Sequence, residues 1–212
     1  AQAFPFFEWG LNWCIAGYSL QFLIIHAAVV EKHGKALILP GSPGSGKSTL
    51  CAALINKGWR LLSDELTLID CGTGMVVPVP RPVSLKNESI KIIANTFVEN
   101  EFSPIVHDTA KGSVCLMKPP TDSVKRAHEI ALPYLIIFPK FNSQSRLNLT
   151  HLSKPGAFMK LAELAFNYDV LGVEGFEVLS DLVERCRVFD FEYDGDYDQA
   201  SDCFEHLMNA ND

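Results

Sequence analysis

The chain has 212 residues, of which 48% are hydrophobic and 20% charged, and its formal net charge is −7 at pH 7. This composition is that of a globular protein that can bury a core, and it excludes a disordered or fibrous chain. The acidic balance argues against a nucleic-acid-binding or membrane-binding surface, because either would need a basic face. We expect one domain covering residues 1–212.

The six cysteines show no C-x₂-C spacing of a zinc or redox motif. Reduced thiols are typical of cytoplasmic proteins, so we expect a cytoplasmic location.

The first thirty residues are strongly apolar, but they lack a basic leader and include Glu8 and Asn12. They therefore predict neither a signal peptide nor a membrane span. A start on alanine rather than methionine suggests a fragment or a processed chain. Residues 6–19 fit either a helix or a buried extended segment. Core packing is expected for the aromatic run, although a missing domain or a second subunit in a homo-oligomer could also cover it: Phe4, Phe6, Phe7, Trp9 and Trp13.

Strands and helices are expected to intermix along the rest of the chain, which predicts an α/β fold around a central sheet. The apolar and β-branched runs predict strands at residues 21–31, 36–40, 59–62, 66–69, 114–117, 134–138 and 188–193. The helical patterns lie at residues 48–57, 88–95, 154–166, 175–185 and 197–208. The segments 118–127 and 142–148 are expected to be exposed loops.

The stretch GSPGSGKST matches the G-x₄-G-K-[ST] pattern of a phosphate-binding loop. Glycines let the backbone wrap so that N–H groups point at phosphate oxygens. Lys47 is expected to reach the β- and γ-phosphates, and the Ser48 hydroxyl to help hold Mg²⁺. The predicted nucleotide-binding residues are Gly41, Ser42, Gly44, Ser45, Gly46, Lys47, Ser48, Thr49, Arg81 and Lys86.

Asp64 and Glu65 follow the strand after the predicted helix of this loop. A kinase needs one carboxylate to position Mg²⁺ and another to orient or deprotonate an acceptor hydroxyl. Both acids could instead be solvated loop residues.

Six further residues have two interpretations each. His26 interrupts an aliphatic strand, where a histidine is commonly a hydrogen-bonded core residue. Arg81 and Lys86 could place positive charge on phosphates or lie on a solvated face. The same question applies with less support to three residues of the segment HDTAKG, because a His-Asp turn is common: His107, Asp108 and Lys111.

Three segments occur in an order that resembles the C-terminal catalytic domain of the HPr serine kinase/phosphorylase family: HAAVVEKHGKALILPG, GSPGSGKST and NKGWRLLSDE. The segments FEWGLNWCIA and RPVSLKNESI are similar to the subgroup called HPr kinase-related kinase A. The resemblance covers most of residues 7–115 and is only a general pattern afterwards. It implies a fold shared with phosphoenolpyruvate carboxykinase, in which the phosphate-binding loop lies on a mixed sheet.

The resemblance also implies roles for the site residues. Lys47 and Ser48 would hold phosphates and metal, and His26 would lie beside the transfer centre. We assign Asp64 as the general base and Glu65 as a metal ligand, with Asp64 as an alternative ligand. The family's second acid is Asp rather than Glu, and its Ile/Gly-rich docking signature does not occur in this chain. HPr is therefore not inferred as the substrate.

The resulting hypothesis is an enzyme that uses ATP and Mg²⁺ to phosphorylate a hydroxyl, namely a serine of a protein or peptide. Two alternatives remain open. A small-molecule or carboxykinase-like phosphotransferase would have a compact polar pocket beside His26 and Arg81. A non-catalytic regulatory module would bind nucleotide without turnover.

Overall fold

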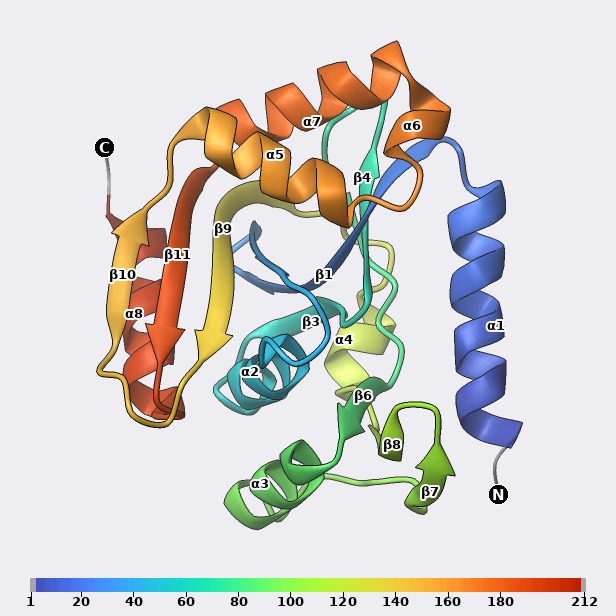
Figure 1. Ribbon diagram of the computed structural model, residues 1–212, viewed down its shortest axis with the longest axis vertical. Helices are drawn as coiled ribbons and strands as arrows, with labels where there is room; N and C mark the ends of the chain where they lie inside the picture. The colour runs from blue at the N-terminus through green and yellow to red at the C-terminus, as the bar shows by residue number, and fades with distance from the viewer. Residues whose placement is uncertain (1–2, 211–212) are drawn as a thin grey trace.

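A computed structural model describes residues 3–210 of the chain. Its main element is an eight-stranded sheet (Figure 1). The strands are β1 (Phe22–Lys32), β2 (Lys35–Pro40), β3 (Arg60–Ser63), β4 (Leu66–Asp70), β5 (Val76–Val77), β9 (Leu132–Phe141), β10 (Asn148–His151) and β11 (Arg187–Tyr193).

The strand order is β10-β11-β9-β2-β1-β4-β5, and β3 also pairs with β1. β9 is parallel to both β2 and β11, and the other pairings are antiparallel. The predicted α/β class with a mixed central sheet is therefore confirmed. β1 and β2 are aliphatic along nearly their whole length, because both faces of these central strands are covered.

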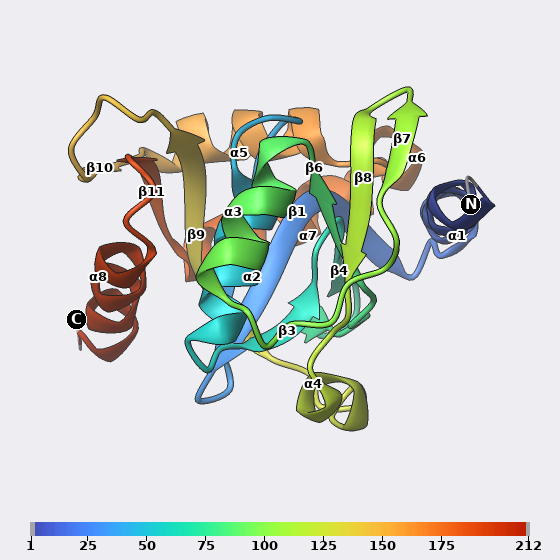
Figure 2. The same ribbon diagram turned by 90° about the horizontal axis from the view of Figure 1, so that it is seen from below.

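Helices cover both faces of this sheet (Figures 1 and 2). On one side lie α5 (Lys154–Leu164), α6 (Tyr168–Leu171) and α7 (Val173–Arg185), which pack on one apolar cluster of the sheet. On the other side, α2 (Lys47–Asn56) and α8 (Tyr197–Asn209) pack on a second cluster. Every residue of α2 from Leu50 to Ile55 is buried, as expected for a helix that is apolar on all sides.

A second, three-stranded sheet lies beside the first, in the order β6-β8-β7. Its strands are β6 (Val83–Lys86), β7 (Val106–Thr109) and β8 (Gly112–Met117). The helix α3 (Glu88–Thr96) follows β6 in the chain. This sheet positions two segments of the candidate site, the strand β6 and the β7–β8 turn.

The N-terminal segment is a helix, α1 (Ala3–Tyr18), at the edge of the molecule beside β7 (Figure 2). Core packing of its aromatic run is wrong for Phe6, Phe7 and Trp13, whose side chains are exposed, and Trp9 is only half-buried. The side chain of Phe4 lies outside the described part. Among residues 3–210, no helix combines the length and apolar character needed to cross a membrane.

Most of the predicted strands and helices are confirmed, but several short elements were missed. The segment 118–127, expected to be a loop, contains the helix α4 (Thr121–Lys125), and the Ser123 hydroxyl accepts a hydrogen bond from the Leu61 amide. The strands β5, β7 and β10 and the helix α6 have two to four residues each. Such short segments show no periodicity, so long-range pairing determines them.

A buried ion pair holds the end of the β1–β2 hairpin. Arg60 donates from Nε to Glu31, and each side chain is only 4% exposed. The other guanidinium nitrogens donate to the carbonyls of Arg126 and Glu129, at 2.9 and 3.0 Å. A charge buried this deeply stabilises a protein only when its partners are complete.

Replacement of Arg60 by Met should lower the free energy of unfolding by about 3–5 kcal/mol, because the buried Glu31 would lose this ion-pair partner. Urea denaturation followed by circular dichroism measures this loss. Lys91→Met is the control, since Lys91 pairs with Glu88 on an exposed helix surface. Its effect should stay within about 0.5 kcal/mol. Equal effects of both substitutions would contradict the structural role of Arg60.

Candidate active site

The Gly-rich loop lies between β2, which ends at Pro40, and α2, which begins at Lys47. The strand–loop–helix context predicted from the sequence is therefore confirmed. Gly44 and Gly46 have φ angles of +90° and +91°, a backbone region that favours glycine. The loop thus needs these two glycines to turn from the strand into the helix.

The ends of two strands, β9 and β11, contact the backbone of this loop. The Phe141 amide at the end of β9 donates to the Ser45 carbonyl at 3.2 Å, and the Tyr193 hydroxyl at the end of β11 lies 3.5 Å from the Gly46 carbonyl. A Cβ atom on Gly46 would approach that hydroxyl to 2.8 Å. The sequence did not identify Phe141 or Tyr193 as loop supports.

We expect Gly46→Ala to reduce stability more than Gly44→Ala. Both substitutions place an alanine at a positive φ, which costs roughly 1–2 kcal/mol of stability. Only at Gly46 would the new methyl group meet neighbouring atoms. Tyr193 is held by stacking on Phe191, so it cannot easily move away. Urea midpoints of the two variants test this order, and equal midpoints would contradict it.

The first turn of α2 presents backbone N–H groups toward the loop. The helix begins after Gly46, which provides no capping side chain, and Ser48 and Thr49 are half-buried at its start. Unpaired N–H groups and the positive end of the helix dipole favour an anion at this position. Ser42 and Gly44, on the outer part of the loop, are exposed.

Lys47 lies at the centre of the site and is 5% exposed. Its Nζ lies 3.0 Å from Nε2 of His26, in the neighbouring strand β1. Burial lowers the pKa of Lys47, while Asp64 and Glu65 raise it in part. Burial and the Lys47 charge lower the pKa of His26 to about 4. At neutral pH the imidazole is thus uncharged and can accept a hydrogen bond from the ammonium.

His26 contacts Lys47 at the start of α2, so it lies at the candidate site. It pairs with Leu66 across the β1–β4 register, so it lies opposite the residue that follows Glu65. Its ring is half-buried and lies 5.7 Å from the ring of Phe166. The alignment of β1 with β4 brings His26, Lys47 and the acidic pair into one site.

His26 should make stability dependent on pH between about 6.5 and 4. Its folded-state pKa lies below the ordinary value of 6.5, so the unfolded chain binds a proton that the folded chain does not. Its contribution to stability is complete above pH 6.5 and is lost as the pH falls toward 4.

Urea denaturation at pH 7.5 and pH 5 measures this dependence. The loss on acidification should be smaller for His26→Asn than for the wild type. His107→Asn, at an exposed position, should behave like the wild type. An unchanged pH dependence in His26→Asn would contradict the assignment.

Asp64 is buried, which overturns the solvated-loop alternative for this residue. Its Oδ2 accepts a hydrogen bond from the Ser84 amide at 2.9 Å, and Oδ1 is buried with no hydrogen-bond partner among the described residues. Burial raises the pKa of Asp64, although the nearby Lys47 opposes this shift. A carboxylate with a free oxygen and a raised pKa is suited to accept a proton.

Glu65 has a different environment. Its Oε1 lies 3.2 Å from Nζ of Lys86, and its Oε2 accepts a hydrogen bond from the Asn12 side chain at 2.8 Å. Burial alone would raise the pKa of Glu65, but Lys86, Lys111 and Lys47 together hold it below its usual value. Glu65 is therefore the member of the acidic pair whose surroundings favour the ionised form.

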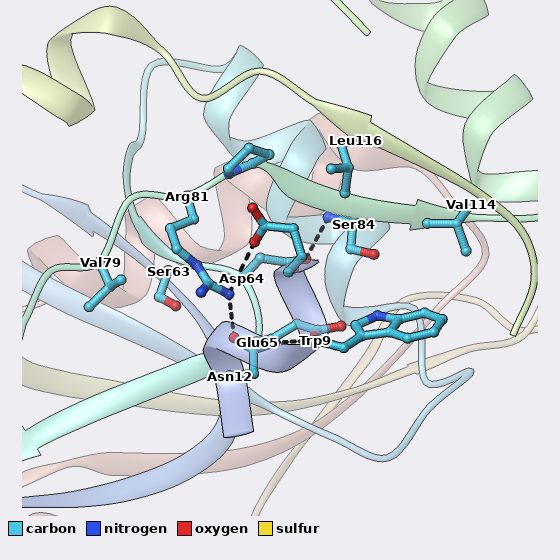
Figure 3. Close-up of a pocket in the computed structure, with 12 residues that line it drawn as sticks. Trp9, Asn12, Ser63, Asp64, Glu65, Val79, Arg81, Ser84, Val114 and Leu116 are labelled. Atoms are coloured by element: carbon cyan, nitrogen blue, oxygen red, sulfur yellow. Dashed lines mark hydrogen bonds and ion pairs between the residues drawn. The ribbon is translucent and has the colours of Figure 1, made fainter. Parts of the chain in front are cut away.

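Arg81 lies beside α1, and Lys86 lies beside Glu65. Arg81 forms an ion pair with Glu8 of α1 at 3.3 Å and donates a hydrogen bond to Asn12 (Figure 3). Neither basic side chain has a hydrogen bond to the loop within residues 3–210. Their predicted contact with phosphates stays a prediction.

A cavity of about 20 Å³ lies between α1 and the acidic pair. Asp64, Glu65, Arg81 and Asn12 are among its lining residues (Figure 3). This volume accommodates about one water molecule.

Lys111 is a site residue for which the sequence offered little support. The β7–β8 turn brings its side chain over the ring of Trp9, with Nζ 4.9 Å from the ring centroid. Burial lowers the pKa of Lys111, and the Glu65 charge raises it in part. Its neighbours His107 and Asp108 are exposed. Only the third residue of that candidate group therefore belongs to the site.

No group of three or more His, Cys, Asp or Glu residues converges on one point within residues 3–210. Mg²⁺ commonly takes only one or two carboxylates, together with water and phosphate oxygens. Asp64, Glu65 and Ser48 remain the candidate ligands.

Sequence comparisons show a partial similarity to known proteins. A family described as SynChlorMet cassette protein ScmC matches residues 16–84, the segment from the end of α1 to β6. The HPr kinase/phosphorylases of two Treponema pallidum strains, one of them the Nichols strain, are each 36% identical over 52 residues. Those residues are 24% of this chain and only 16% of each relative. The comparisons thus indicate a distant relation to an HPr kinase/phosphorylase.

Proposed function

We propose that the protein is a kinase that uses ATP and Mg²⁺ to phosphorylate a hydroxyl, with a serine of a protein or peptide as the acceptor. The observation that carries the proposal is the combination of a buried Lys47 at the Gly-rich loop with Asp64, whose Oδ1 has no partner among the described residues. The relation to HPr kinase/phosphorylase supports a kinase-like activity.

In this proposal the fold is of the phosphate-binding-loop type, like that of HPr kinase and phosphoenolpyruvate carboxykinase. The glycines and serines of residues 41–46 and the amides at the start of α2 would surround the phosphates. Lys47 would stabilise negative charge on them. The neutral His26 holds the ammonium in position without adding a positive charge that would repel it.

The residues present also fit Mg²⁺. Ser48 lies in the first turn of α2, and Glu65 is ionised beside the acidic partner Asp64. Glu65 would serve as the metal ligand by exchanging one of its present partners, Lys86 or Asn12. A bound Mg²⁺ would neutralise charge on the transferred phosphoryl group.

Asp64 would act as the general base. Its Oδ1 would accept the proton of the acceptor hydroxyl as the hydroxyl oxygen bonds to phosphorus and the bond to the leaving phosphate breaks. The raised pKa of Asp64 supports this role, because a base works best when its pKa is near the operating pH.

A polypeptide acceptor is favoured over an enclosed small molecule. The alternative of a small-molecule kinase predicts a compact polar pocket beside His26 and Arg81. The cavity that Arg81 lines has a volume of only about 20 Å³. A hydroxyl presented from outside on a polypeptide does not need a larger enclosed space.

Two substitutions separate binding from catalysis. Lys47→Ala should reduce phosphoryl transfer by a factor on the order of 10²–10³, because it removes charge stabilisation of the phosphates. Asp64→Asn should reduce transfer by roughly 10²–10⁴ while ATP still binds. Calorimetry with ATP and Mg²⁺ measures binding, and mass spectrometry of a peptide pool measures transfer.

Lys91→Ala, at an exposed position on α3, is the control for both variants. Near-normal transfer by Lys47→Ala would overturn the site assignment. ATP binding with no transfer to any peptide by the wild type would instead favour a regulatory module.

A further inference from the structure

The helix α1 exposes large apolar side chains and directs its charged residue toward the protein. An amphipathic helix normally turns its apolar face toward the protein and its polar face toward solvent. In α1 the side chains of Phe6, Phe7 and Trp13 are 62–80% exposed, whereas its only charged residue, Glu8, is half-buried against the site. The exposed hydrophobic groups add nothing to the attachment of α1 to the rest of the protein.

The attachment is largely polar and is centred on the acidic pair. Glu8 forms an ion pair with Arg81, and Asn12 bonds to both Arg81 and Glu65. The Trp9 ring covers the ammonium of Lys111. Glu8 and Asn12 are one helical turn apart, so both reach the site from one side of α1. An apolar contact is made by Ile15, which packs beside Ile24 and Leu66.

Without α1, the site would have more positive charge than its own carboxylates can pair. Glu65 pairs with Lys86. The only ion-pair partner of Arg81 within residues 3–210 is Glu8, and one of its terminal nitrogens, Nη1, is buried with no hydrogen-bond partner there. Lys111 has no ion pair within 4.0 Å in the described part, and its ammonium faces the Trp9 ring. A carboxylate from outside would complete the pairing of these cations.

We propose that α1 occupies the binding site of the acceptor, and that Arg81 and Lys111 select an acidic acceptor segment. This inference rests on the proposed kinase function and adds a substrate class to it. A helical acceptor in the place of α1 would put a carboxylate on Arg81, as Glu8 does. Its hydroxyl, one turn later, would lie where Asn12 lies, beside Glu65 and the cavity lined by Asp64. The preferred acceptor thus has an acidic residue four positions before the serine.

Arg81 and Lys111 are specificity-determining residues in this assignment. For Arg81 this differs from the phosphate contact that the sequence suggested. A substitution that changes the charge at Arg81 distinguishes the two roles. If Arg81 contacts a phosphate, the affinity for ATP changes; if it contacts the acceptor, the preference among peptides changes.

The test uses the full chain and three synthetic peptides that differ only four positions before a single serine, where they carry Glu, Gln or Lys. Initial rates of serine phosphorylation are measured by mass spectrometry. We expect wild-type kcat/KM to be at least about tenfold higher for the Glu peptide than for the Gln peptide, since one hydrogen bond to a charged group contributes about that much. Arg81→Glu should reverse the order, so that the Lys peptide becomes the best substrate.

A second pair of variants tests whether α1 competes with the acceptor. Asn12→Ala should weaken the attachment of α1 and lower the KM of the Glu peptide several-fold, with kcat little changed. Trp13→Ala, on the exposed side of α1, is the matched control and should leave both constants at the wild-type values. A raised KM in Asn12→Ala would mean that α1 completes the site, and it would overturn the competition.

The outcomes also separate this inference from the proposed function. Phosphorylation of all three peptides at equal rates, or a preference that Arg81→Glu leaves intact, would overturn the acidic acceptor and leave the kinase standing. A loss of ATP affinity of more than about tenfold in Arg81→Gln would mean that Arg81 contacts a phosphate of ATP and not the acceptor. ATP binding without phosphorylation of any peptide would overturn the kinase itself, and this inference with it.

Discussion

The burial of the Lys47 ammonium is the constraint on which the rest of the site depends. A charged group that loses almost all of its solvent needs nearby partners, or it becomes neutral. Here the nearest partner is an uncharged imidazole, 3.0 Å away, and the carboxylates of Asp64 and Glu65 contribute opposite charge. Removing solvent strengthens each of these interactions, and it would also strengthen the hold on a bound phosphate.

Burial raises the pKa of both neighbouring carboxylates, but their net pKa shifts are opposite because their partners differ. Asp64 receives one backbone amide and has its pKa raised by burial, whereas Glu65 is surrounded by lysines that hold its pKa low. Two adjacent acids with pKa values pushed apart are a common arrangement for dividing base and charge-binding roles. The strand end after β3 thus supplies two chemically different groups within two residues.

The segment with sequence similarity to known proteins combines site and framework residues. Its Asp64 and Glu65 enter the candidate site, while Arg60, only four residues before Asp64, forms a buried pair with Glu31 in the β1–β2 hairpin. The ion pair fixes β3 against β1, and this pairing determines where β3 ends and the acidic pair begins. α1 then covers the acidic pair through the contacts of Glu8 and Asn12, although it adds no strand to the central sheet.

The sequence by itself determined the α/β class, the main strands and helices, and the loop with Lys47 at the start of α2. These features are local: an apolar run, a glycine pattern and a helical period each act over a few neighbouring residues. Tertiary structure alone decided that His26 contacts Lys47, that Arg81 faces α1 rather than the loop, and that Lys111 approaches Glu65. It also decided the shortest strands and the exposure of Phe6, Phe7 and Trp13. Each of these outcomes depends on which distant segments pair, through the β1–β4 register, the β7–β8 turn and the polar attachment of α1, and no local pattern in the chain specifies that pairing.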